Sequence, residues 1–385
     1  MNSSINWCGR VGMLGPVLWS LLCLAGCGSA DEALETLGSS QEPLTWSNLT
    51  LNKGWSAANG TAPAVTKVGN IIVFRGAFKG DPNVVKDDPF VLPPAYRPVV
   101  TMGGGPSVDL RVTMSGNAGG TLKFFNNNTV GKYETHLIQD GLAGPGPQAL
   151  TFTSLDGVSI DVYPGTEAAT IWGGQYSYRL DSHPATWQKI NGFVRFEGEL
   201  TDSDYKTAGD MFLFSLPSGQ GVIPGQDVYV PVTLCPGIDP HGNSGSYGRL
   251  HVYSTGAVYV EPEANNTASA NCATSLEGTG YSMTTGGTTL TLGTGWTALS
   301  SRAVKVRNDN GVIRFEGAVH NGTSTTVATL PTGMRPAQTI YVVADGYGAM
   351  HLRLIIDSAG KVKVDDSMLG FASEALSLDG VSFAF

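Results

Sequence analysis

The sequence contains few charged side chains and no cluster of basic ones. Only 14% of its 385 residues are charged, and the formal net charge at pH 7 is −9. Proteins that bind nucleic acid neutralise its phosphates with clustered Lys and Arg. The scattered cations therefore argue against a nucleic-acid ligand, and the acidic balance fits an ectodomain held off an anionic membrane surface.

Long helical patterns are also missing. Beyond residue 46, no segment repeats apolar residues at the period of an amphipathic helix. Glycine, by contrast, is abundant, with 51 residues, about twice the usual share. Gly and Asn accept the positive φ angles of tight hairpins. The composition therefore predicts an all-β protein of short strands joined by many turns.

The motifs of common catalytic centres are absent as well. The sequence has no P-loop, no dinucleotide fingerprint and no nucleophile elbow. No two of its histidines have metal-ligand spacing; they are His136, His183, His241, His251, His320 and His351. We therefore expect no enzyme, no cofactor and no metal site. A polysaccharide hydrolase is the remaining catalytic alternative, because its acid pair need not be close in sequence.

The N-terminal segment is too short to span a membrane, which takes roughly 20 apolar residues. Arg10 precedes a mostly apolar stretch, 11–24, that ends in small residues, the order of a secretory signal. Leu24-Ala25-Gly26-Cys27 resembles the lipobox of bacterial lipoproteins. That resemblance implies cleavage of a signal peptide, 1–26, and lipidation of Cys27. An ordinary secretory signal with an incidental Cys is the alternative.

Lipidation would determine where the chain resides. Two or more acyl chains anchor a protein stably, and the lipoprotein resemblance implies more than one. Gly28 follows the cysteine, and no Asp stands there as an inner-membrane retention signal. We therefore expect a lipid anchor in the cell envelope, in the outer membrane, with residues 27–45 as a flexible linker. The sequence leaves open which face of that membrane carries the protein.

The other cysteines indicate a disulfide. Cys8 and Cys23 fall within the signal peptide, so Cys235 and Cys272 remain as a pair in an exported protein. Such a pair predicts a disulfide. Zinc binding is the alternative, although neither Cys has a second Cys or a suitably spaced His nearby.

The chain after the linker repeats itself. Ser154–Ile160 returns almost unchanged as Ser377–Phe383, and a shorter version occurs at Ser275–Gly278. A strand pattern ending in Phe-x-Gly precedes each, at 74–76, 196–198 and 315–317. Such self-similarity indicates duplicated modules. We place them at 46–162, 163–281 and 282–385, each large enough to fold alone, like beads on a string.

Within the modules, apolar and polar residues alternate. In Phe193–Glu197, Val194 and Phe196 face one side; in Val312–Glu316, Arg314 and Glu316 face the polar side. This period of two is typical of half-buried antiparallel strands. Three tandem antiparallel β-sandwich modules, jelly-roll-like and rich in turns, are therefore predicted.

An early Gly-Trp pair, the Phe-x-Gly strand, a Leu-Pro then Arg-Pro step and the closing Ser-Leu-Asp-Gly resemble the β-sandwich modules of bacteriophage tail-fibre and tail-tip proteins. The third module matches best, and the second lacks Arg-Pro and gains the Cys pair. The resemblance covers most of the chain after the linker, and its motifs are structural. It implies recognition of a surface, often a glycan-bearing one, or a spacer role, and it implies no reaction.

Two sets of residues are candidates for a site. Asp156, Glu277 and Asp379 share one module position; we interpret them as turn residues whose carboxylates cap backbone N–H groups, with a calcium or sugar ligand as the alternative. Tyr247 and Tyr347 lie in Gly-rich segments. Because binding residues concentrate on loops, we predict that these two tyrosines are exposed and contact a ligand.

These features predict a non-enzymatic, lipid-anchored envelope protein that recognises a glycan or an envelope protein. Each module would bind weakly, and repetition would raise the effective affinity. A structural spacer, or an assembly component of an envelope or phage-tail-like structure, is the alternative. The sequence does not determine the oligomeric state.

Overall fold

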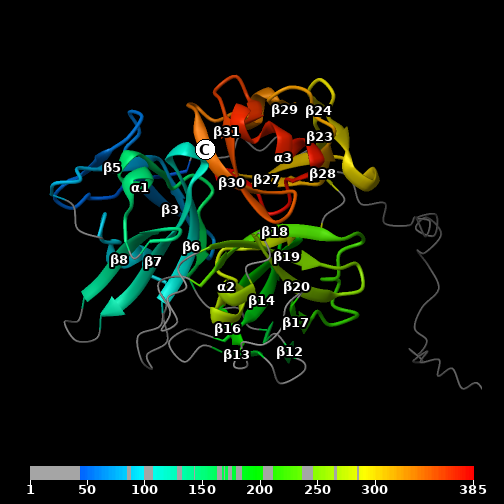
Figure 1. Ribbon diagram of the computed structural model, residues 1–385, viewed down its shortest axis with the longest axis horizontal. Coiled ribbons are helices and arrows are strands. Elements are labelled where there is room, and N and C mark those ends of the chain that lie inside the picture. The colour runs from blue at the N-terminus through cyan, green and yellow to red at the C-terminus, as the bar shows by residue number, and fades with distance from the viewer. Residues whose placement is uncertain are drawn as a thin grey trace, which may run out of the picture. The chain divides into compact units, whose positions relative to one another are not determined.

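Figure 1 shows the protein as a computed structural model. Residues 42–385 form one compact unit. The structure describes residues 44–84, 88–98, 107–127, 132–142, 144–162, 167–168, 170–171, 176–178, 184–202, 211–235, 246–263, 267–283 and 286–385. The expected signal peptide, Cys27 and nearly all of the linker therefore lie outside the described residues.

The first module, 46–162, comprises strands β1 to β10 and helix α1. Their bounds are β1 (Ser47–Asn48), β2 (Trp55–Ala57), β3 (Ala64–Val68), β4 (Ile71–Arg75), β5 (Ala77–Gly80), η1 (Pro94–Tyr96), β6 (Ser107–Met114), η2 (Ser115–Asn117), β7 (Gly119–Asn127), β8 (Lys132–Gln139), α1 (Pro147–Thr151), β9 (Thr153–Ser154) and β10 (Ser159–Asp161).

The second module, expected at 163–281, comprises strands β11 to β22 and helix α2, and its last strand extends one residue beyond that boundary. Their bounds are β11 (Glu167–Ala168), β12 (Thr170–Ile171), β13 (Tyr176–Tyr178), β14 (Thr186–Ile190), β15 (Phe193–Glu197), β16 (Glu199–Asp202), β17 (Met211–Ser215), β18 (Val228–Leu234), β19 (Ser246–Val252), β20 (Ala257–Pro262), α2 (Thr267–Cys272), β21 (Thr274–Ser275) and β22 (Gly280–Ser282).

The third module, 282–385, comprises strands β23 to β34 and helix α3. Their bounds are β23 (Thr288–Thr289), β24 (Thr291–Leu292), β25 (Thr297–Ala298), η4 (Leu299–Ser301), β26 (Lys305–Asp309), β27 (Val312–Glu316), β28 (Ala318–His320), β29 (Thr326–Thr329), η5 (Thr332–Met334), β30 (Ile340–Gly346), β31 (Met350–Ile356), β32 (Lys361–Val364), η6 (Asp366–Met368), α3 (Leu369–Glu374), β33 (Leu376–Ser377) and β34 (Ser382–Ala384).

The strand order repeats from module to module. The second module has a four-stranded sheet, β11-β14-β15-β22, and an eight-stranded sheet, β12-β17-β20-β19-β18-β21-β16-β13. The third has the same two orders, β23-β26-β27-β34 and β24-β29-β32-β31-β30-β33-β28-β25. The first repeats the small sheet as β1-β3-β4-β10 and six positions of the large one as β2-β5-β9-β6-β7-β8. The protein is all-β, and the fold class predicted from the sequence is confirmed.

Each module buries one core between its two sheets. The Phe of each Phe-x-Gly motif lies at its centre: Phe74, Phe196 and Phe315 are all fully buried. Phe74 stacks on Phe124 of the larger sheet, with 5.7 Å between ring centroids, and Phe196 meets Phe214 at the same separation. Side chains from two facing sheets thus fill one interior, which is the arrangement of a β-sandwich.

The modules are not separated like beads. Strands β6, β18 and β30, which occupy the same place in the three large sheets, contact one another, and Figure 1 shows their labels close together. The small sheets also touch, through β22 with β27 and β34 with β4. Equivalent strands of the three modules therefore surround a common axis. We call the contact between two modules a seam and name it by the modules that it joins, so that seam 1–3 joins modules 1 and 3.

This packing corrects the expected polar face of the inner strands. Arg195 in β15 and Arg314 in β27 were expected to face outward, yet only 1% and 6% of their surfaces are exposed. The alternation of apolar and polar residues correctly predicts which side chains share a face of each strand. The polar face is buried because the next module covers it.

Candidate ligand groove at the module seams

One hydrogen bond recurs at all three seams. The hydroxyl of Ser154 donates to the Tyr341 carbonyl at 2.9 Å, joining modules 1 and 3. Ser275 donates to the Asp109 carbonyl at 2.9 Å across seam 1–2, and Ser377 donates to the Tyr229 carbonyl at 2.8 Å across seam 2–3. Each serine opens the repeated Ser-Leu-Asp/Glu-Gly motif, and each acceptor holds the same position in its strand. The three contacts run head to tail and close a ring.

The glycine of the same motif lies where no side chain fits. Gly380 has φ +76°, and a Cβ there would lie 2.9 Å from the Gly280 carbonyl oxygen of module 2. A Cβ on Gly157 would meet the Ser382 oxygen at 2.8 Å, and one on Gly278 would meet the Ser159 oxygen at 2.5 Å. The motif is therefore a turn at which the backbones of two modules approach too closely for a Cβ.

Each repeated carboxylate caps a backbone N–H of its own module, and Asp156 also accepts the Tyr341 N–H of module 3 at 3.3 Å. Asp156 accepts the backbone N–H of Gly76 at 2.8 Å, Glu277 that of Gly198 at 2.9 Å and Asp379 that of Gly317 at 2.9 Å. The interpretation of these residues as capping turn residues is confirmed. Each carboxylate ties the closing turn to the Phe-x-Gly strand, which fixes the serine that crosses the seam.

A groove of about 410 Å³ runs along seam 1–3, within the usual size range of ligand pockets. Its aromatic wall is made by Phe152 of module 1 and Tyr341 of module 3, which meet edge to face at 4.9 Å. Arg353 lies beside them, with its guanidinium 5.5 Å from the Tyr341 ring. Both aromatic side chains are half-buried, so part of each ring remains open to a ligand.

The polar wall of this groove carries positive charge. Asn59, Lys79, Ser115 and Thr151 of module 1 supply donors and acceptors. Lys79 is exposed, and none of the described residues forms an ion pair with it. Asp365 neutralises Arg353 at 3.0 Å, but among the described residues no Asp or Glu lines the groove. In a chain of net charge −9, this groove is a local region of positive charge.

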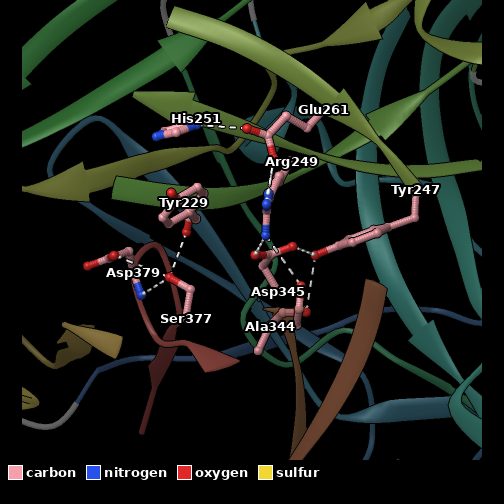
Figure 2. Close-up of polar contacts among 10 residues, drawn as sticks. Tyr229, Tyr247, Arg249, His251, Glu261, Ala344, Asp345, Ser377 and Asp379 are labelled. Atoms are coloured by element: carbon pink, nitrogen blue, oxygen red, sulfur yellow. Dashed lines mark hydrogen bonds and ion pairs between the residues drawn. The ribbon is translucent and has the colours of Figure 1, made fainter. Parts of the chain in front are cut away.

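Seam 2–3 contains a buried polar network (Figure 2). Arg249 donates to Glu261 of its own module at 2.6 Å and to Asp345 of module 3 at 3.2 Å. Tyr247 reaches across the same seam, and its hydroxyl donates to the Ala344 carbonyl at 3.2 Å. Burial raises the pKa of Asp345 to about 7, although Arg249 acts in the opposite direction. The network is a connection between modules rather than an open site.

His251 extends this network toward the surface. Its Nδ1 lies 2.7 Å from Glu261, and its Nε2 lies 3.3 Å from Asp227. The ring stacks on Tyr253, with centroids 3.7 Å apart, and leans on Tyr229 at 4.3 Å. Both ring nitrogens thus face carboxylates of module 2. No group of His, Cys, Asp and Glu among the described residues is arranged to hold a metal ion.

The two tyrosines predicted to contact a ligand have opposite surroundings. Tyr247 lies in strand β19 and is fully buried, so its predicted exposure on a loop is wrong. The strand begins at Ser246, directly after the Gly-rich run, and carries the ring into the seam. Tyr347 is 57% exposed, in the turn between β30 and β31. It follows Gly346, whose carbonyl accepts from Arg249 at 3.4 Å, so Tyr347 stands at the outer edge of seam 2–3.

The cysteine pair forms the predicted disulfide. Cys235, next to the end of β18, joins Cys272, the last residue of α2, with 5.2 Å between the Cα atoms. Cys27 lies outside the described residues. Among the described residues, no helix has the length and apolar character needed to cross a membrane.

Sequence reasoning missed the groove because its walls come from different modules. A signal was nevertheless present. Tyr229 and Tyr341 occupy one position of the repeated strand, and Arg249 and Arg353 occupy one position of the next strand. Each Arg guanidinium lies over the Tyr of its own module, at 4.5 Å and 5.5 Å. The repeated Tyr and Arg pair therefore lies at seam 1–3 in module 3 and at seam 2–3 in module 2.

Comparisons with known proteins do not assign the chain to a family. No family model matches the chain, and neither a curated protein nor a solved structure is significantly similar to it.

Proposed function

We propose that this protein is a non-enzymatic, lipid-anchored envelope protein that binds an acidic glycan in the groove at seam 1–3. The observation that carries the proposal is the combination, in one groove, of two half-buried aromatic rings with exposed Lys79, which has no ion pair within the described part of the chain. Aromatic faces stack on apolar sugar faces, hydroxyls and amides bind sugar hydroxyls, and a cation selects a carboxylate or phosphate. Arg353 and Asn59 complete such a set.

The test is a binding measurement on the full chain carrying Cys27→Ala, so that no lipid interferes. Oligogalacturonate is the acidic probe, and its methyl ester is the matched uncharged probe. We expect the acidic form to bind more tightly and to weaken as salt rises, because salt screens exposed charges. Equal affinity for the two forms, or no binding of either, would refute the proposed ligand class.

Two variants locate the site. Lys79→Glu reverses the side-chain charge and should weaken binding of the acidic probe at least tenfold. Lys67→Glu makes the same change at another exposed strand lysine of module 1 outside the groove, and should leave binding unchanged. Tyr341→Leu keeps an apolar side chain but removes the ring, and about a three- to tenfold loss is expected from stacking. If Lys79→Glu and Lys67→Glu behave alike, the groove is not the site.

The anchor is a separate part of the proposal and rests on the Leu24–Cys27 motif. Growth with labelled palmitate should label the wild-type protein and not the Cys27→Ala variant. Fractionation of the labelled protein into the outer membrane would support the expected location. Labelling that survives the substitution would remove Cys27 as the lipidated residue.

A spacer or assembly role is less well supported by the seams. The three serine contacts close on themselves, so no copy of this contact remains free to join a sister chain. A monomer in light scattering is therefore expected for the Cys27→Ala chain. A stable oligomer without glycan binding would instead favour the assembly role.

A further inference from the structure

Three equivalent hairpin turns, one from each module, surround a second cavity at one end of the common axis. They join β3 to β4, β14 to β15 and β26 to β27, and their Asn residues, Asn70, Asn191 and Asn310, line it. Its volume is about 90 Å³, well above the space that one water needs. The groove at seam 1–3 shares no residue with it. This cavity is therefore distinct from the proposed glycan site.

Two buried arginines line the cavity. Arg195 and Arg314 line it from equivalent positions of β15 and β27. Arg195 is well paired: it donates to Asp161 at 2.6 Å and lies within 3.4 Å of the Ser159 hydroxyl. The equivalent position in β4 is Val73, so module 1 has no arginine at this position.

Arg314 is poorly compensated. Its Nε lies 3.0 Å from Asp309, but the geometry gives no hydrogen bond there. Asp309 is also shared with Arg307, at 2.7 Å. The guanidinium stacks on Phe193 of module 2, 4.1 Å from the ring centroid. Burial, reinforced by the neighbouring Arg195, lowers the pKa of Arg314 to about 10.

Arg314 does not have a carboxylate of its own. Its partner Asp309, which also lines the cavity, pairs with Arg307 as well. A buried cation without good hydrogen bonds is costly, and a counter-ion in the adjoining space removes that cost. Only 6% of Arg314 is exposed, so bulk solvent cannot provide much of this compensation.

We propose that the axial cavity binds one small monovalent anion, of the halide class, held by Arg314 and the Asn-bearing turns of all three modules. Because residues from every module line it, the bound anion stabilises the ring of modules as well as the charge on Arg314. The site is structural and does not depend on the glycan proposal.

The first test is thermal unfolding of the full protein at constant ionic strength, with sodium chloride replacing sodium gluconate. Gluconate is too large for the cavity. Saturation by chloride should raise the unfolding midpoint by about 2 °C or more. Arg314→Gln should remove the chloride dependence. Lys305→Gln, at a cation of the same hairpin that does not line the cavity, should keep it.

The second test uses the wild-type protein alone, and so does not depend on the folding of any variant. Crystals soaked in sodium bromide should show an anomalous peak in the cavity beside Arg314. Identical melting curves in chloride and gluconate, or a bromide-soaked crystal without that peak, would overturn the proposal.

Discussion

The Ser377 hydroxyl donates to the Tyr229 carbonyl at 2.8 Å, across the seam between the third and second modules. Ser154 and Ser275 make the same bond at the other two seams. A sequence repeat therefore encodes both a turn within a module and the contact with its neighbour. The folded unit is a ring of three linked copies, and its stability depends on the seams as well as on the cores.

The first prediction concerns the seam glycines. Gly380→Ala should lower the free energy of unfolding by about 2–4 kcal/mol, because positive φ disfavours Ala and the added Cβ meets a backbone oxygen. Gly116 also has positive φ, +65°, but a Cβ there meets nothing within 4 Å. Gly116→Ala should therefore lose only about 1 kcal/mol. Urea unfolding measures both, and equal losses would show that the close approach at the seam is unimportant.

The second prediction separates Tyr247 from Tyr347. Tyr247→Ala removes a fully buried ring and should destabilise the protein by about 3–5 kcal/mol. Tyr247→Phe loses only the hydroxyl contacts with Ala344 and Asp345, worth about 1 kcal/mol. Tyr347→Ala removes an exposed ring and should change stability by less than about 0.5 kcal/mol. If Tyr347 contacts a ligand, its loss appears in affinity alone.

These two tyrosines show what sequence reasoning can reach. The strands, the closing turns and the disulfide were predictable, because alternation, Asp-Gly turns and a cysteine pair are local or compositional signals. The direction of Tyr247 was not, because it depends on where β19 begins relative to the glycines. The module boundary expected at 281 falls inside β22, which ends one residue later at Ser282.

The contacts between modules could not be predicted from local sequence patterns. Lys79 and Arg353 line one groove although they come from different modules. A duplicated sequence does not reveal whether its copies are separate or packed together, since both arrangements satisfy the same alternation. The burial of Arg195 and Arg314 follows from the packed arrangement alone.

The third prediction concerns pH. Burial raises the pKa of Asp345 to about 7 and that of Asp156 to about 6, both well above the unfolded value of about 3.9. The folded state therefore binds these protons more tightly, and stability falls as pH rises from about 4 through 7. The unfolding midpoint should be higher at pH 5 than at pH 8.

Asp345→Asn tests that assignment, because the amide cannot ionise. Its midpoint should change less between pH 5 and pH 8 than that of the wild type. Asp365→Asn is the matched control, since hydrogen bonding from Ser367 lowers the pKa of Asp365 and it titrates below this range. Parallel pH profiles for the wild type and Asp345→Asn would show that Asp345 is ionised throughout.

The last prediction concerns the Cys235–Cys272 disulfide, which links residues 37 apart in sequence. Closing a loop of that length constrains the unfolded chain, so the double variant with Ala at both positions should lose about 4 kcal/mol of stability. Dithiothreitol should lower the unfolding midpoint of the wild type to that of the double variant and leave the variant unchanged. A midpoint that falls with a chelator and not with dithiothreitol would instead indicate the zinc alternative. The disulfide predicts the opposite pattern, because its sulfurs bind each other and offer no thiolate to a metal.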